Sequence, residues 1–282
     1  MPKSTFTCLR KICSWIANRD ARCVTDQRLQ NLISNLYRID LDAEVRAQLM
    51  IGSDEKLFCY DAKRISRENL DALWKWILDE DCYGLAEIRE DAPHLIDIGS
   101  HLGVLPYAFL TRFPNGYVTI VEPDSVSFEI AVKNVKSVVA SNESRLRAIQ
   151  KAVAPQKGTA TLAKSSRVDW RSTLDLNPEF LKRPIFNTDE WLQREKVELV
   201  TLAEVLQAHS KNTVSLLKIT IPGSIEADVV SSSLDSIDLL NPNRIAIDIY
   251  PENEVKVLTE LKSIGYRPVR RVRQSISIFS RS

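Results

Sequence analysis

The spacing of apolar residues separates an N-terminal part of the chain from a longer C-terminal part. The N-terminal part predicts two helices, over 29–36 and 70–77, each with one apolar face, and a short strand or hairpin over 51–61 between them. Ser66 stands where it can cap the second helix. An acidic stretch over 79–91 predicts a connection to the part that follows. We therefore expect a helical extension over residues 1–85.

From residue 86 to 282 short apolar runs alternate with amphipathic stretches. The apolar runs predict strands over 95–98, 117–121, 146–153, 158–163, 197–202, 214–221 and 244–250. The stretches between them predict helices over 104–113, 123–139, 225–240 and 252–264, with a short helix ending at His209. An inserted loop over 164–195 interrupts the rhythm, and a hairpin over 266–279 ends the chain. Such alternation is typical of an α/β domain with a mostly parallel sheet and helices on both faces.

Composition limits the partners of this domain. The 282 residues suffice for one large core or two small ones, and the net charge is +1. No global field then attracts a polyanion, which disfavours nucleic acid as a partner. A C-terminal group of arginines could hold a phosphate-bearing substrate: Arg267, Arg270, Arg271 and Arg273. The alternative, that these arginines protect late strands from edge pairing, is favoured.

The chain shows no membrane or export signal. No apolar run approaches the roughly 20 residues of a membrane helix, and basic residues interrupt the N-terminal region where a signal peptide would need an apolar core. We expect a cytoplasmic protein without a membrane partner. The five cysteines are irregularly spaced, so we expect reduced thiols and no metal. A metal site built from Cys8, Cys13 and Cys23 is the disfavoured alternative.

The residues around the first strand of the α/β part form a candidate nucleotide-type site. Asp97 lies inside that strand, and a turn from Gly99 to Gly103 leads into a helix. Glycine allows close approach of a ligand, and a helix N-terminus offers free N–H groups. Glu122, at the end of the second strand, can accept both hydroxyls of a ribose. An ordinary βαβ turn without a ligand is the alternative, but the acid, both glycines and Glu122 together favour a cofactor.

The spacing of the turn indicates which cofactor. A dinucleotide site requires Gly-x-Gly-x-x-Gly, which this turn lacks, so a dehydrogenase is disfavoured. A carboxylate at Asp97 is poorly placed against a pyrophosphate but suits a cofactor that carries an ammonium group. The pattern acid-x-Gly-x-x-x-Gly resembles motif I of the S-adenosylmethionine (SAM) methyltransferases.

A wider resemblance covers about residues 94–250. It rests on Ile-Asp-Ile-Gly-Ser-His-Leu-Gly (96–103), Val-Glu-Pro (121–123), Asn134, Ala152-Val153 before Gly158, Val200-Thr201-Leu202 and Leu-Lys-Ile-Thr-Ile-Pro-Gly (217–223). These segments resemble the FkbM-type methyltransferases, a mainly O-methylating family. The resemblance implies a Rossmann-like class I SAM methyltransferase fold with a C-terminal antiparallel hairpin. It also implies SAM as cofactor, bound by Asp97, Gly99, Ser100, His101, Gly103, Glu122 and Ala152.

The chain departs from the family in the acceptor half. The family pattern Lys-x-Asp-x-Glu-Gly-x-Glu keeps its lysine and glycine, as Lys218 and Gly223, but loses its acids to Thr220, Pro222 and Ile225. Two acids stand near the family positions: Glu226, one residue off, and Asp248, which is one methylene shorter than the family's acid. The catalytic candidates are therefore Lys218, as a desolvated base or a substrate clamp, and Glu226. Their alternatives are a strand-end lysine and an acid that serves the helix dipole.

The sequence favours a SAM-dependent methyltransferase acting on a hydroxyl of a small molecule or sugar. The alternative is a catalytically degenerate protein of the same fold that serves as a binding or scaffold module. The lost acids favour the alternative, whereas Asp97, Gly99, Gly103 and Glu122 favour the enzyme. The oligomeric state is left open.

Overall fold

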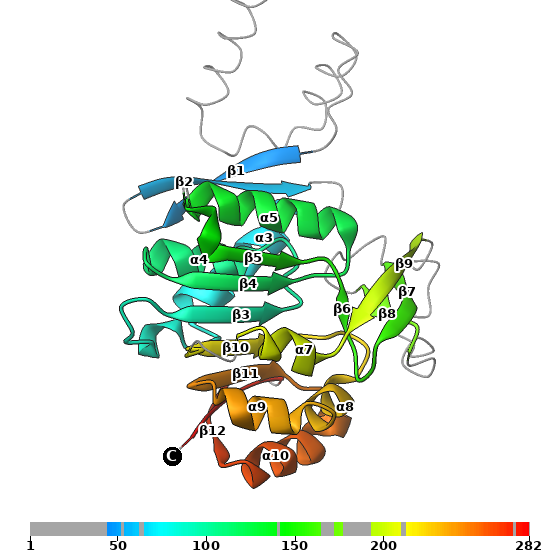
Figure 1. The fold of residues 1–282 in the computed structure, drawn as a ribbon. Helices are drawn as coiled ribbons and strands as arrows, with labels where there is room; N and C mark the ends of the chain where they lie inside the picture. Colours follow the sequence, from blue (N-terminus) through cyan, green and yellow to red (C-terminus); the bar gives the residue numbers. More distant parts are fainter. Residues whose placement is uncertain are drawn as a thin grey trace, which may run out of the picture. The chain divides into compact units, whose positions relative to one another are not determined.

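The computed structural model describes residues 44–51, 54–61, 65–139, 142–164, 172–176, 193–209, 213–272 and 275–281 (Figure 1). The helix predicted over 29–36 and most of the insertion predicted over 164–195 lie outside these residues, as do Cys8, Cys13, Cys23 and Arg273. The residues from Val45 onward form one compact unit. In the described parts of the chain, no helix combines the length and the apolar composition that crossing a bilayer requires.

The central sheet has seven strands among the described residues. The order is β12 (Tyr266–Val272), β13 (Ile276–Arg281), β11 (Arg244–Asp248), β10 (Leu216–Ile219), β3 (His94–Ile98), β4 (Tyr117–Val121) and β5 (Leu146–Ile149). The five strands from β11 to β5 are parallel, and β13 pairs antiparallel with both β11 and β12. The predicted parallel sheet and its final antiparallel hairpin are thus confirmed. All residues of β3 and β10 are buried, as expected of central parallel strands covered on both faces.

Helices cover both faces of this sheet, and alternate residues of each strand point to opposite layers. Leu95 packs in a core with α4 (Val104–Arg112) and α5 (Ser125–Val139). Its neighbour Ile96 packs in a second core with the helices of the other face. Those helices are α7 (Leu202–Gln207), α8 (Glu226–Ser231), α9 (Leu234–Leu240) and α10 (Glu254–Ser263).

The helix predicted over 225–240 is two helices, α8 and α9. A run of three serines covers the last residue of α8 and the two residues between the helices, and serine hydroxyls compete for helix carbonyls. Ser231 Oγ donates to Ala227 O at 2.8 Å, and Ser232 Oγ donates to Val229 O at 3.1 Å. The apolar period continues across this break, so the sequence pattern alone did not locate it.

A second, four-stranded sheet is formed by β6 (Ala152–Val153), β9 (Gln193–Val200), β7 (Gly158–Lys164) and β8 (Thr173–Leu174), in that order. β7 and β9 pair antiparallel over their length. The single strand predicted over 146–153 is divided between the two sheets, with β5 in the first and β6 in the second. The chain therefore leaves the central sheet directly after β5.

Residues from the end of β2 (Asp54–Asp61) to β3 pack into the same core as the sheet. A two-stranded sheet of β1 (Glu44–Ile51) and β2 is followed by α3 (Arg67–Trp74). The predicted cap is confirmed, because Ser66 Oγ accepts a hydrogen bond from Asn69 N at 3.2 Å. A π-helical turn, Lys75–Asp79, continues α3. The rings of Phe58, Trp74 and Tyr107 meet edge to face, with centroids 5.3 to 5.7 Å apart.

The acidic stretch 79–91 is more than a connection. It contains the 3-10 turn Leu85–Glu87 and buries three apolar side chains in the core that α4 and α5 share: Cys82, Leu85 and Ile88. The boundary predicted between residues 85 and 86 stays a prediction.

Candidate functional site

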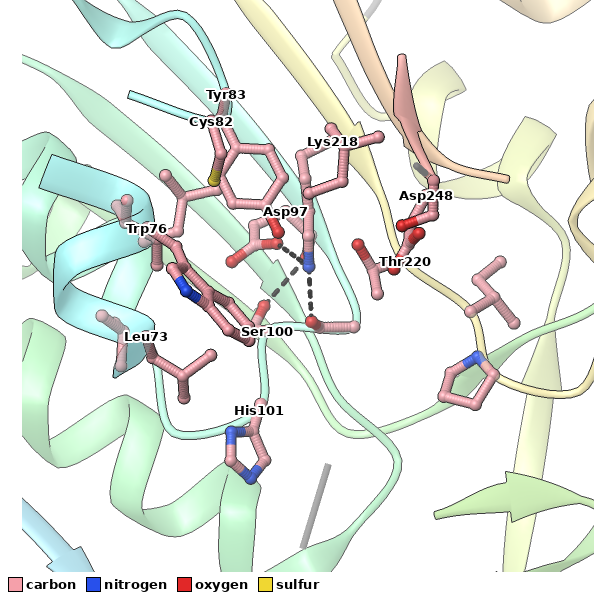
Figure 2. Close-up of a pocket in the computed structure, with 18 of the residues that line it drawn as sticks. Leu73, Trp76, Cys82, Tyr83, Asp97, Ser100, His101, Lys218, Thr220 and Asp248 are labelled. Atoms are coloured by element: carbon pink, nitrogen blue, oxygen red, sulfur yellow. Dashed lines mark hydrogen bonds and ion pairs between the residues drawn. The ribbon is translucent and has the colours of Figure 1, made fainter. Parts of the chain in front are cut away.

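A cavity of about 610 Å³ opens at the carboxyl ends of β3, β10 and β11 (Figure 2). Ligands in open α/β sheets bind at this edge, where consecutive strands diverge. The lining side chains that bear on the chemistry are Trp76, Tyr83, Asp97, Ser100, Lys218, Thr220 and Asp248. Figure 2 shows them converging from the π-helical turn, the segment after it and the strand ends.

Asp97 and Lys218 form a buried ion pair at the floor of this cavity. The two residues are register partners on β3 and β10, and Lys218 Nζ lies 2.9 Å from Asp97 Oδ1. The same Nζ donates to the carbonyls of Ile98 at 3.1 Å and Gly99 at 2.6 Å. An ammonium has three N–H donors, so these contacts use all of them. This geometry favours a positioning role for Lys218 over that of a base, because a base needs a free lone pair.

Asp97 retains one unused oxygen. Its side chain is 1% exposed, and its Oδ2 has no hydrogen-bond partner among the described residues. A buried acceptor without a donor costs roughly 1 to 3 kcal/mol. Such an atom at a cavity wall fits a donor that a ligand supplies.

The glycine turn owes its composition to packing within the protein. Gly99 has φ +75°, and a Cβ there would lie 2.1 Å from Thr220 O. Gly103 has φ +78°, and a Cβ there would lie 3.0 Å from Ala131 Cα on α5. These contacts give glycine a packing reason at both positions, while close approach of a ligand stays a prediction. Gly99 lines the cavity, whereas Gly103 is not among its lining residues. Ser100 also lines it and donates from Oγ to Asp97 O at 2.9 Å.

A second, smaller cavity of about 110 Å³ contains the ribose candidate. It shares Gly99, His101 and the segment Thr220–Pro222 with the first cavity, so the two adjoin across the turn. Glu122 and Ala152, both predicted at the cofactor, line it.

Backbone N–H groups hold the Glu122 carboxylate in place. Its Oε2 accepts from His101 N at 2.8 Å, and its Oε1 accepts from Asp124 N at 3.0 Å. Burial raises the pKa of Glu122 to about 7, against the lowering effect of these donors. Each oxygen keeps a second lone pair for another donor. The site can thus offer two acceptors side by side.

Glu226 lies outside both cavities. It is fully buried at the start of α8, where its Oε1 accepts from Tyr250 N at 2.7 Å and Asn253 Nδ2 at 3.0 Å. Burial raises the pKa of Glu226. Its contacts hold the loop after β11, so the structure does not bring it together with Lys218.

The cavity residues that were not among the predicted site residues include Asp248, Trp76 and Tyr83. Asp248 ends β11, and its carboxylate makes no hydrogen bond or ion pair with the residues that the structure describes. Its position at a strand end was a signal in the sequence. Trp76 and Tyr83 come from the predicted extension. Trp76 does not fall on the apolar face of the predicted helix, so the sequence pattern gave no indication that it lines a cavity. Burial, with the carboxylates of Asp248 and Asp97 nearby, raises the pKa of Tyr83 well above its usual range, so its phenol stays a donor.

Two of the C-terminal arginines, Arg270 and Arg271, have partners within the protein. Arg270 donates to Glu80 O at 2.9 Å and lies 3.7 Å from Asp81 Oδ2. Arg271 pairs with Glu254 at 2.5 Å. These contacts disfavour a phosphate site at Arg270 and Arg271, while protection against edge pairing stays a prediction.

Comparison with solved structures finds distant likenesses. A protein from Streptococcus pneumoniae assigned as a tRNA (m1A22) methyltransferase, solved in complex with S-adenosyl-L-methionine, has a TM-score of 0.41 and 14% identity, over 72% of each chain. A precorrin-6y C5,15-methyltransferase from Geobacter metallireducens has a TM-score of 0.41 and 13% identity, over 80% of this chain and 94% of that one. An rRNA methylase from Streptococcus thermophilus has a TM-score of 0.38 and 13% identity, over 72% of this chain and 94% of that one. Neither a protein-family model nor a curated protein matches the sequence.

These likenesses correct one expectation. Several of the neighbours are tRNA or rRNA methyltransferases, so the expectation that disfavoured nucleic acid as a partner is wrong and is withdrawn. It rested on net charge alone, which does not report how charge is distributed around a site. The mostly parallel sheet, with a cavity at the carboxyl ends of its strands, gives this chain a Rossmann-like α/β fold.

Proposed function

We propose that this protein is a SAM-dependent methyltransferase. The observation that carries the proposal is the Asp97 carboxylate. One of its oxygens is held by Lys218, while the other is buried at the cavity wall without a donor. A ligand ammonium satisfies such an oxygen and matches its charge.

The residues present fit the remainder of the cofactor. Glu122 offers two acceptors for ribose hydroxyls. Ala152 lines the same small cavity, which has room for part of the adenine ring of the cofactor. His101 has a left-handed backbone conformation, with φ +49°, and its backbone N–H donates to Glu122. The turn is therefore preorganised around that carboxylate. When bound, the cofactor supplies an electrophilic methyl group.

The acceptor belongs in the larger cavity, and we retain O-methylation of a small-molecule or sugar hydroxyl, as the FkbM resemblance implies. The scaffold alternative drew its support from the lost acids around Thr220 and Pro222. Asp248 supplies a carboxylate at the same strand edge, which favours the enzyme. A cytoplasmic location remains a prediction.

Calorimetric titration of the full chain with SAM, and separately with NAD, tests the proposal. We expect SAM to bind with one site per chain and NAD to give no heat. Circular dichroism of the same sample verifies folding. A folded protein that gives no SAM binding would overturn the proposal, and SAM binding without transfer to any acceptor would favour the scaffold alternative.

A further inference from the structure

We propose that the acceptor is a flat apolar ring that bears one hydroxyl, and that Asp248 takes the proton of this hydroxyl. This inference rests on the proposed function and deepens it by naming the substrate class. It uses the part of the larger cavity that lies beyond Asp97 and the glycine turn.

One wall of this cavity is apolar and aromatic. Trp76 lies in the π-helical turn Lys75–Asp79, a feature often found at functional sites. Its ring is half-buried and extends along the cavity toward Ser100 in Figure 2. Further apolar lining comes from α3, the π-helical turn, the loop after β10, and β13: Leu73, Ile77, Ile221, Pro222 and Ile276. Aromatic side chains favour stacked or edge-to-face contact with another ring.

The wall offers few partners to a polyhydroxylated ligand. Each hydroxyl buried without a partner costs roughly 1 to 3 kcal/mol. Beyond the ion pair, the polar side chains of this part are Tyr83, Thr220, Asp248 and Ser275, with Tyr250 beside them. Pro222 cannot donate from its backbone. A ring with one hydroxyl is satisfied by this set, whereas a sugar leaves several hydroxyls against apolar side chains.

The charges of the cavity indicate a neutral acceptor. Lys218 and Asp97 cancel each other, and Asp248 adds one negative charge. SAM carries one net positive charge, since its ammonium and carboxylate cancel and its sulfonium remains. Within the larger cavity these charges and the sulfonium sum to zero when the acceptor is neutral, and the Glu122 carboxylate belongs to the smaller cavity. A charged acceptor would leave an unbalanced charge beside apolar walls, which is costly.

The same balance holds through the reaction. A lone pair of the acceptor oxygen forms the new O–C bond, the electron pair of the broken S–C bond goes to sulfur, and the hydroxyl proton goes to the Asp248 carboxylate. The sulfonium and the carboxylate lose their charges together. A base in a dry site supplies roughly 100- to 10,000-fold in rate.

The test compares 2-naphthol with methyl β-glucoside as probes on the full chain, with and without SAM. We expect naphthol, and not the glucoside, to bind in calorimetry and to be methylated with SAM present. Trp76→Leu should weaken naphthol binding about tenfold, and Trp76→Phe should restore part of it. Binding of the glucoside alone, or unchanged naphthol affinity in Trp76→Leu, overturns the substrate class.

Asp248→Asn tests the base separately from the substrate class. Naphthol and SAM should still bind, while the methylation rate constant falls about a hundredfold or more and becomes steeply dependent on pH, because hydroxide must replace the carboxylate. Asp228→Asn, an exposed aspartate on α8 that pairs with Lys256, is the matched control and should behave as wild type. A rate and pH profile equal to those of wild type in Asp248→Asn overturns this role. Failure of SAM binding in wild type would overturn the proposed function instead, and naphthol binding without SAM would still report on the substrate class.

Discussion

Lys218 and Asp97 are direct partners across β10 and β3, with Nζ and Oδ1 2.9 Å apart and side chains 5% and 1% exposed. The pair joins two central strands beneath the glycine turn. Because Lys218 also binds the carbonyls of Ile98 and Gly99, one ammonium sets the position of the acid and of the turn together. The site thus has a rigid floor before any ligand enters.

Lys218→Met should destabilise the protein by roughly 3 to 5 kcal/mol, because it leaves the Asp97 charge buried without its partner. SAM binding should weaken as well, since the turn loses two hydrogen bonds. Urea unfolding followed by circular dichroism measures the first effect. Lys256→Met, which breaks the exposed pair with Asp228, is the control and should cost less than about 1 kcal/mol. Equal stability of the two variants would show that the buried pair is not a structural clamp.

Glu122→Ala should weaken SAM binding about tenfold to a hundredfold, because the ribose hydroxyls lose a charged acceptor worth roughly 1.5 to 3 kcal/mol. Calorimetry with SAM measures the change. Glu143→Ala is the matched control, since Glu143 lines neither cavity and pairs with Lys136 at the surface. Wild-type affinity in Glu122→Ala would remove this residue from the site.

SAM affinity should rise as pH increases through about 7, the pKa of Glu122 in the folded protein. Hydroxyl donors bind the ionised carboxylate better, so binding near and below this pH should release a proton. The stability of the free protein depends on pH in the opposite direction from SAM affinity, because the protonated form of Glu122 is the one that burial favours. The raised pKa gives a contribution that is fully present below the ordinary value near 4.5 and is lost as pH rises through 7. Titrations in buffers of different ionisation heat detect the released proton, and buffer-independent heats would contradict this assignment.

The protein should lose stability in acid because of two buried histidines. His94 and His209 both approach the Thr119 hydroxyl, at 3.4 and 3.1 Å, and their rings are 4.7 Å apart. The pKa of each histidine is lowered to about 4, mainly by burial. The charge of His209 contributes to the lowered pKa of His94, and the charge of Arg147 does the same for His209. A depressed base pKa means that the stability is present above about 6.5 and declines as pH falls toward 4.

The slope of that decline measures the number of protons taken up. Two histidines give at most about 2.7 kcal/mol per pH unit, and one gives half of that. Urea unfolding at several pH values should show a shallower slope in His209→Gln than in wild type. An unchanged slope in His209→Gln would contradict a role of this pair in acid unfolding.

Local patterns predicted most of the central sheet. The bounds predicted for β4 agree with the structure, and those of β3 and α4 differ by one residue at one end. These elements are short, regular and bounded by glycine or a strand-end acid, so their period is visible in the sequence. The strand over 146–153 was predicted as one element because its apolar residues continue across the point where the chain changes sheets. Periodicity reports that a residue is buried and does not report which sheet buries it.

The sequence by itself determined the α/β class and the places of Asp97, inside β3, and Glu122, directly after β4, and from their spacing it predicted a cofactor type. Only the tertiary structure decided that Lys218 is held by Asp97 and the turn, that Glu226 lies away from the cavities, and that Trp76 lines the larger cavity. The physical reason is distance along the chain. Lys218 and the carbonyl of Ile98 are 120 residues apart, and their contact depends on strand register, which no local period specifies.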